Sequence, residues 1–170
     1  MTIRAASKDD ASSLAALSIE VWIGTYLRNG VSKVFADYAL SSFTTEKFEA
    51  FIDDENEIIL VSDNSDGING FVRVTLRSPA PIEESPKTET EVATLYVQPR
   101  HKGKGIGKRL LESVFRLCAE RGCAGVWLAV NSENRDAIAF YNRFGFTRAG
   151  QTAFRIADQS YLNNVMVKRP

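Results

Sequence analysis

The sequence predicts an α/β (α+β) fold in a single domain spanning residues 1–170, on three observations. Several segments repeat apolar residues at helical spacing, and two strand-like runs are joined by a turn at 63–67. Residues 91–130 follow the order strand, tight turn, helix and strand. This crossover unit predicts two parallel strands, whereas the hairpin predicts an antiparallel pair. The length suffices for one full core and is short for two.

In the first half, Ser7 and Thr44 each precede a run with helical spacing, as helix caps do. Gly24 weakens the first of these helices near its end. The aromatic-rich segment that begins at Val34 predicts a second, short helix. The expected elements are a strand at 2–5, helices at 8–26, 34–38 and 44–52, and hairpin strands at 57–62 and 68–76.

Residues 78–86 contain three prolines, which cannot donate to a regular strand ladder. A loop is therefore expected. Its expected flexibility and its acidic residues suggest a lid or the rim of a substrate site.

In the second half, a strand ends at Val97 and the helix after the turn ends at Gly122. The wholly apolar run 125–130 is typical of a strand covered on both faces. Residues 131–134 cap a last helix that Gly145 ends. The remaining expected elements are that helix at 135–144, closing strands at 146–148 and 161–168, and a loop or hairpin at 149–159.

The formal net charge is zero, but the two halves differ. Residues 1–90 hold eight Lys and Arg and fifteen Asp and Glu, a net charge of −7, and residues 91–170 carry +7. A basic half suits a nucleotide and an acidic half suits a cationic co-substrate. The alternative, that the acids are scattered solvated surface charge, stays open at this point.

The sequence has no apolar run long enough to span a membrane, and its start lacks the apolar core of a signal peptide. A cytoplasmic protein that does not bind membranes is expected. Two cysteines and one histidine do not supply a zinc site without carboxylates. Cys118 and Cys123 are therefore expected to be buried free thiols, and no metal is expected.

The turn after Val97 holds alternating glycines at 103, 105 and 107, directly before a helix. Glycines let the backbone approach a ligand, and the N–H groups of a helix start favour an anion. Neither the P-loop pattern nor the dinucleotide pattern fits the spacing. A polyphosphate is the expected ligand, because five basic residues lie in the same turn: Arg100, Lys102, Lys104, Lys108 and Arg109.

Two motifs carry a family resemblance. Arg100-His-Lys-Gly103-Lys-Gly105 and, in the same order along the chain, Asn134-Arg-Asp-Ala-Ile-Ala-Phe-Tyr-Asn-Arg-Phe-Gly-Phe146 resemble the hallmarks of the GCN5-related N-acetyltransferases (GNAT). The resemblance covers essentially the whole chain. It implies a mixed, mostly antiparallel central sheet, splayed at the cofactor strand and flanked by helices on both faces. It also implies acetyl-coenzyme A as co-substrate.

The resemblance further implies roles for residues. Tyr141 is at the position of the general acid that protonates the departing thiolate, and Glu91 is the leading candidate for the base, with Glu89 and Glu20 as alternatives. Asn134 would bond the pantetheine arm from the side facing the cofactor strand. The other expected cofactor contacts are Leu95, Tyr96, Val97, Arg100, His101, Lys102, Gly103, Lys104, Gly105, Ile106, Gly107 and Lys108.

The expected reaction is direct attack of a primary amine on the thioester of acetyl-coenzyme A. The segments 18–26, 43–48 and 124–130 are similar to the bacterial spermidine/spermine acetyltransferase branch, so spermidine or spermine is the favoured partner. Protein N-termini, lysines and other small amines remain alternatives, as does a non-catalytic coenzyme A sensor. Nucleic-acid binding is not expected, because no aromatic residues are interleaved with the basic ones. A homodimer is compatible with the resemblance.

Overall fold

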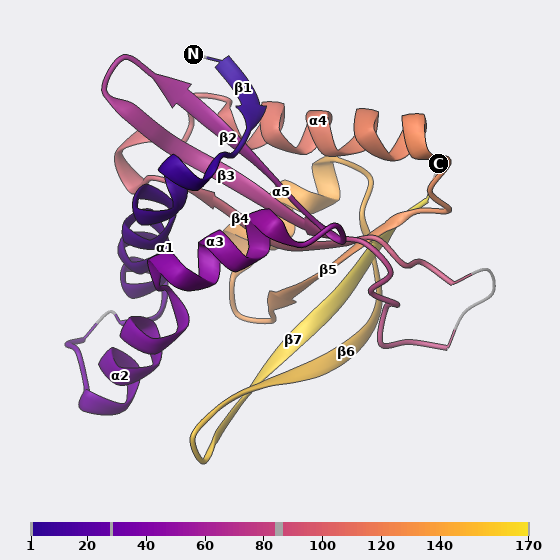
Figure 1. Cartoon of the computed structure of the whole chain (residues 1–170). Helices are drawn as coiled ribbons and strands as arrows, with labels where there is room; N and C mark the ends of the chain where they lie inside the picture. The colour runs from indigo at the N-terminus through magenta and orange to yellow at the C-terminus, as the bar shows by residue number, and fades with distance from the viewer. Residues whose placement is uncertain (1, 28, 84–86, 170) are drawn as a thin grey trace. The chain divides into compact units, whose positions relative to one another are not determined.

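The computed structural model describes residues 2–27, 29–83 and 87–169 (Figure 1). The chain divides into two compact units. The first comprises Met1–Val74 and Thr94–Arg116, and the second comprises Thr75–Ala93 and Leu117–Pro170. The expectation that residues 1–170 act as one domain stays a prediction.

The fold is mixed α/β, and its strands follow the hydrogen-bonded order β1-β2-β3-β4-β5-β7-β6. Strand β4 (Glu91–Val97) contributes its first three residues to the second unit and the rest to the first. Most neighbours are antiparallel, and β4 and β5 (Val126–Asn131) pair in parallel at Glu91↔Trp127. The predicted crossover is thereby confirmed.

The first unit contains β1, β2, β3 as far as Val74 and the end of β4, together with helices and short 3-10 turns. Strand β1 (Thr2–Ala5) pairs with β2 (Glu57–Asn64) antiparallel, and a two-residue link joins β2 to β3 (Gly67–Thr75). A 3-10 turn, η1 (Lys8–Asp10), leads into α1. The helices are α1 (Ala11–Tyr26), α2 (Lys33–Ser42), α3 (Thr45–Asp53) and the first part of α4 (Ile106–Arg121).

The core of the first unit lies between its helices and its strands. Leu14, Val61 and Phe71 are fully buried in one cluster that joins α1, α3, β2 and β3 (Figure 1). Phe48 of α3 packs edge-on against Phe71 at 5.8 Å between ring centroids. Alternation along β3 places Gly70 on the opposite face of that strand, where its neighbour is Ile106 of α4.

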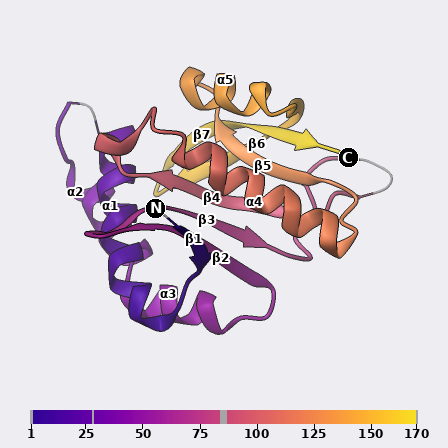
Figure 2. The same cartoon turned by 90° about the horizontal axis from the view of Figure 1, so that it is seen from above.

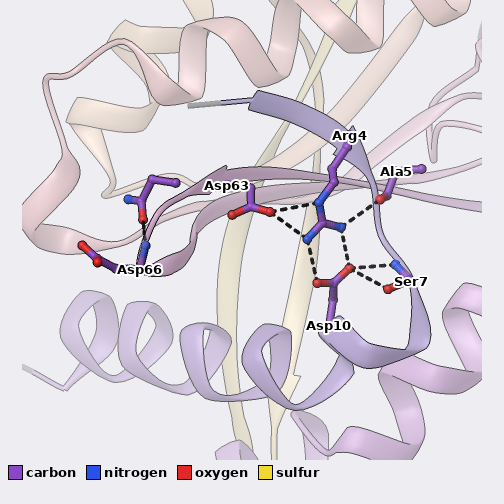
Figure 3. Close-up of polar contacts among 7 residues, drawn as sticks. Arg4, Ala5, Ser7, Asp10, Asp63 and Asp66 are labelled. Atoms are coloured by element: carbon purple, nitrogen blue, oxygen red, sulfur yellow. Dashed lines mark hydrogen bonds and ion pairs between the residues drawn. The ribbon is translucent and has the colours of Figure 1, made fainter.

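An ionic cluster fastens the start of this unit (Figure 3). Arg4 donates to both carboxylate oxygens of Asp10, at 2.7 and 2.9 Å, and to Asp63 at 3.0 Å. The Ser7 N–H donates to Asp10 at 2.7 Å. The cluster lowers the pKa of Asp10 to about 2, because Arg4 donates hydrogen bonds to its carboxylate. Residues from β1, η1 and β2 are thus joined by one guanidinium.

The second unit contains β5, β6 (Thr147–Ile156), β7 (Gln159–Lys168), α5 (Arg135–Arg143) and the last turns of α4 (Figure 2). Strand β7 lies between β5 and β6 and is antiparallel to both. The predicted closing strand at 146–148 is wrong in its extent, since β6 continues to Ile156 and forms a hairpin with β7. Of the two alternatives for 149–159, the hairpin is right.

The segment between β3 and β4 has packing contacts and hydrogen bonds over its described residues. Ala80 and Ile82 pack against Trp127, Val165 and Val167 of the second unit. Two hydrogen bonds, Ser78 N to Glu89 O at 2.9 Å and Ala80 N to Thr88 O at 2.8 Å, tie its two ends together. The expected loop is confirmed for these residues, to which no helix or strand is assigned, and its role as a lid or the rim of a substrate site stays a prediction. Residues 84–86 lie outside the described chain.

Other expectations are confirmed with small changes. Helix α2 extends to Ser42, beyond the predicted end at residue 38. Helix α4 ends at Arg121, where Gly122 has φ +64°. Both cysteines are free thiols, Cys118 buried and Cys123 half-buried. Burial and the neighbouring Cys123 raise the pKa of Cys118 to about 12, so it stays protonated at neutral pH.

Candidate functional site

The predicted phosphate turn lies in the first unit, between the end of β4 and the start of α4. The Gln98 N–H donates to Asn69 O at 2.9 Å, so pairing with β3 continues one residue beyond β4. A short 3-10 helix, η2 (Pro99–His101), then reverses the chain. The sequence folds this way because Pro99 fixes the first position of η2 and three glycines follow within eight residues.

Two of these glycines have backbone conformations that other residues rarely adopt. Gly103 has φ +78° and Gly105 has φ +76°. A Cβ built on either would meet no atom within 4 Å, so space is open above both residues. The turn therefore presents backbone with open space beside it, which is what close approach by a phosphate requires.

The charges of the turn fit a polyphosphate. Lys102 and Lys104 are exposed, and Lys108 is exposed on the first turn of α4, 3.8 Å from Glu112. The first N–H groups of α4 have no acceptor within the helix, and the helix dipole adds positive potential there. Helix start, glycines and cations lie in one segment, so these residues fit the pyrophosphate of coenzyme A.

Gly70 is a residue of this region that sequence reasoning missed. A Cβ at Gly70 would lie 3.0 Å from Ile106 Cγ2 and 3.0 Å from Tyr96 O. Only glycine therefore lets the first turn of α4 sit directly on β3 beside β4. The available signal was a glycine in the interior of an otherwise β-branched strand run, which often marks such an approach.

The part of strand β4 that lies in the first unit directs alternate side chains to the two faces of the sheet. Tyr96 packs edge-on against Phe71 at 5.8 Å and joins the cluster with α1 and α3. Leu95 and Val97 alternate to the face where α4 begins, and Val97 lies beside Gly70. The three residues expected to contact the pantetheine arm are thus anchored by side chains on both faces.

Two further polar residues lie near the turn in the same unit. The Gln98 amide donates to the Glu20 carboxylate of α1 at 3.2 Å. The structure thus brings one alternative base candidate, Glu20, next to the residue that begins the turn. The His101 Nδ1 atom is buried, and no hydrogen-bond partner for it is found among the described residues.

Glu91 lies in the second unit, at the start of β4, and is half-buried. The Ser78 hydroxyl donates to Glu91 Oε2 at 2.7 Å. The Trp127 indole N–H in turn donates to Ser78 O at 2.7 Å. Glu89, the other alternative base, is exposed, and its backbone oxygen accepts from Ser78 N.

The second motif forms α5 in the same unit. The Asn134 side-chain oxygen accepts from Ala137 N at 3.2 Å and caps this helix. Tyr141 is half-buried between two aromatic rings, with centroids 5.3 Å from Phe140 and 5.7 Å from Phe146. Helix α5 therefore holds the Tyr141 ring in place through packing, and the cap predicted within residues 131–134 is confirmed at Asn134.

The described residues offer no candidate for two other classes of site. Within the described ranges, no helix is both long and apolar enough to cross a bilayer. Over the same described ranges, no three His, Cys, Asp or Glu side chains gather as metal ligands would.

Comparison with known proteins identifies relatives along most of the chain. The acetyltransferase (GNAT) family profile matches residues 28–146. An uncharacterized N-acetyltransferase of Mycobacterium bovis is 25% identical over 159 residues, which are 94% of this chain and 97% of that protein. The N-alpha-acetyltransferase RimI of Mycobacterium tuberculosis is 41% identical over 66 residues, 39% of this chain and 40% of that one.

A solved structure has a similar fold over the full length. The PaiA N-acetyltransferase of Thermoplasma acidophilum, in complex with coenzyme A, has a TM-score of 0.78 and 20% identity, with 100% of both chains covered. At that identity the match concerns the fold alone.

Proposed function

The chain belongs to the acetyltransferase (GNAT) family and is an N-acetyltransferase that uses acetyl-coenzyme A, and we propose that it acetylates an aliphatic polyamine of the spermidine and spermine class. The observation that carries this proposal is the acidic first half, with a net charge of −7 over residues 1–90. Its α1 carries the exposed Glu20 beside Gln98, where the phosphate turn begins. Carboxylates near the donor turn favour a cationic acceptor over a neutral one.

On the donor side, we assign the pyrophosphate to the turn from Arg100 to Lys108. Open space at Gly103 and Gly105, the helix start and the surrounding cations support this assignment. Backbone groups of residues 95–97 and the Asn134 amide are assigned to the pantetheine arm, on the strength of the family motifs. Acetyl-coenzyme A, when bound, supplies the acetyl group as a thioester.

On the acceptor side, Glu91 is assigned to proton removal. An alkylammonium with a pKa of about 10.4 must lose a proton before attack, which at pH 7 costs roughly 4–5 kcal/mol. A carboxylate that takes this proton, directly or through a water, lowers the barrier. The N–C bond then forms as the C–S bond breaks, and the Tyr141 hydroxyl gives a proton to the departing sulfur. The nitrogen releases its second proton, which restores the Tyr141 hydroxyl through solvent and leaves the neutral amide.

A second acceptor class is favoured by one observation. The relative that is 41% identical over 66 residues is named an N-alpha-acetyltransferase, so an N-terminal α-amine of a protein is the alternative. The pKa of an α-amino group is about 8, well below that of a polyamine. This acceptor would need less help in losing its proton.

The test is release of coenzyme A from acetyl-coenzyme A with spermidine, spermine, an aminoglycoside, amino acids and short peptides. We expect turnover with the two polyamines at much lower concentrations than with the peptides. Turnover with peptides alone would replace the polyamine proposal with the N-terminal one. Turnover with none of them, despite acetyl-coenzyme A binding, would contradict both acceptor classes.

A further inference from the structure

Ser78 is held in the second unit by hydrogen bonds to both of its backbone groups. Its N–H donates to Glu89 O at 2.9 Å, and its carbonyl accepts from Trp127 Nε1 at 2.7 Å. Trp127 is itself buried in the cluster with Ala80 and Val165. Both backbone groups of Ser78 therefore have hydrogen-bond partners within the same unit.

The Ser78 side chain points toward Glu91. Its hydroxyl donates to Glu91 Oε2 at 2.7 Å, the short distance typical of a hydrogen bond to a carboxylate. Glu91 is in register with Trp127 across the parallel pair, and Trp127 N donates to Thr90 O at 2.9 Å. The Trp127 side chain thus bonds Ser78, and Ser78 in turn bonds the Glu91 carboxylate. The Trp127 backbone N–H bonds the residue before Glu91.

We propose that Ser78 is a positioning residue for Glu91, which fixes the carboxylate so that Oε2 is occupied and Oε1 receives the proton of the acceptor amine. This inference rests on the base role proposed for Glu91. The proton passes from the ammonium nitrogen to Oε1, and the Ser78 hydroxyl keeps its own proton. A carboxylate held in one rotamer loses less freedom on reaching the reactive geometry than one that samples several.

Residues 77–83 and 87–90 thereby gain a function that their sequence did not suggest. They support the aligned carboxylate, and the packing of Ala80 and Ile82 with Trp127 holds that support in place.

The experiment compares Ser78→Ala, Ser78→Thr, Glu91→Gln and the double variant S78A/E91Q in the full chain. We expect a kcat loss of about 100-fold for E91Q and about tenfold for S78A, at similar KM for acetyl-coenzyme A. S78T retains the hydroxyl and should recover to within about threefold of the parent chain. The double variant should equal E91Q, because without the carboxylate the hydroxyl has nothing to position.

The pH dependence separates positioning from damage to the fold. As the assay pH approaches about 10, the acceptor amine loses its proton unaided, and the deficits of both single variants should shrink. A structural defect would persist at every pH. The matched control is Ser113→Ala, whose hydroxyl bonds only locally, to Arg109 O at 3.0 Å on α4, and which should leave kcat unchanged.

Two results would overturn parts of the assignment separately. If E91Q lowers kcat and S78A does not, Glu91 keeps its role and Ser78 loses its own. If E91Q leaves kcat unchanged, the base role of Glu91 fails and the positioning role fails with it. Losses in S78A and E91Q that multiply in the double variant would also contradict positioning.

Discussion

At the scale of single residues, the role assigned to Tyr141 depends on its hydroxyl group. Its ring packs between Phe140 and Phe146, while only its hydroxyl serves the assigned proton transfer. Phenylalanine keeps the ring contacts and removes the proton donor. Ring packing and chemistry can therefore be separated by one substitution.

Tyr141→Phe should lower kcat by about 100-fold, in the range typical of general acid catalysis, with the Kd for acetyl-coenzyme A changed less than about twofold. Steady-state kinetics and calorimetric titration measure the two quantities. Phe144→Leu, at the C-cap of the same helix and outside the assigned roles, serves as the control for packing, because its ring contacts Phe140. An unchanged kcat in Y141F would remove this residue from the mechanism.

Asp10 links the residue scale to the next, since its carboxylate accepts hydrogen bonds both from Arg4 of β1 and from the N–H of Ser7, which precedes η1. Its pKa of about 2 lies below the usual value of about 3.9, so the carboxylate stabilises the fold fully above about pH 4. That contribution is lost as the pH falls from about 4 to 2.

Asp10→Asn should lower the free energy of unfolding at pH 7 by about 2 kcal/mol, because it leaves Arg4 without its main partner. Urea denaturation followed by fluorescence measures this free energy. The control is Asp9→Asn, because Asp9 is the neighbouring residue and is exposed. The difference between variant and parent should shrink below pH 3. A difference that is constant with pH would contradict the charge-based account.

At the scale of elements, the turn between β4 and α4 depends on backbone conformation. Gly105→Ala meets no steric clash, but at φ +76° an alanine is strained by roughly 1–2 kcal/mol. The turn should relax away from its phosphate-binding form.

We expect the Kd for coenzyme A to rise about tenfold in Gly105→Ala, measured by calorimetric titration. The matched control is Gly24→Ala in α1, which also has open space but lies in an ordinary helical conformation. That variant should bind coenzyme A like the parent chain and gain up to about 1 kcal/mol of stability. Equal Kd values for the two variants would show that the conformation of Gly105 is unimportant.

Elements with strong local signals could be predicted from the sequence. Cap residues and apolar spacing located α1, α3 and α4, and the two motifs located the turn and α5. The sequence left a loop or a hairpin open for most of strand β6. The reason is that the link to β7 turns at Ala157, with φ +50°, and alanine is not a typical turn residue. A register shift between Arg148 and Gly150 further disturbs its alternation.

The partners of site residues were less predictable. Nothing local to Glu91 indicates that Ser78 bonds it, because the contact spans thirteen residues and depends on the indole of Trp127. The cap made by Asn134 is by contrast local and is predicted by the sequence, because its side-chain oxygen accepts from the N–H three residues further on. The contact of Ser78 with Glu91 follows from tertiary packing and not from spacing along the chain.

At the scale of the whole molecule, the charge difference between the two halves gives a further prediction. If the acidic half attracts the acceptor, the KM for spermidine should rise steeply with NaCl, since salt screens charges beyond about 8–10 Å. The KM for a singly charged amine should rise much less. Equal salt dependence for both amines, measured at saturating acetyl-coenzyme A, would leave the acidic residues without a role in recognition.

The strand order of the second unit has a consequence for how that unit is made. Strand β7, near the end of the described chain, lies between β5 and β6, which are both synthesised before it. On the growing chain β6 has no strand partner, and β5 has only β4, until residues 159–168 have left the ribosome. Deleting these residues would therefore expose one edge of β5 and leave β6 without a partner, the kind of exposed surface through which chains aggregate.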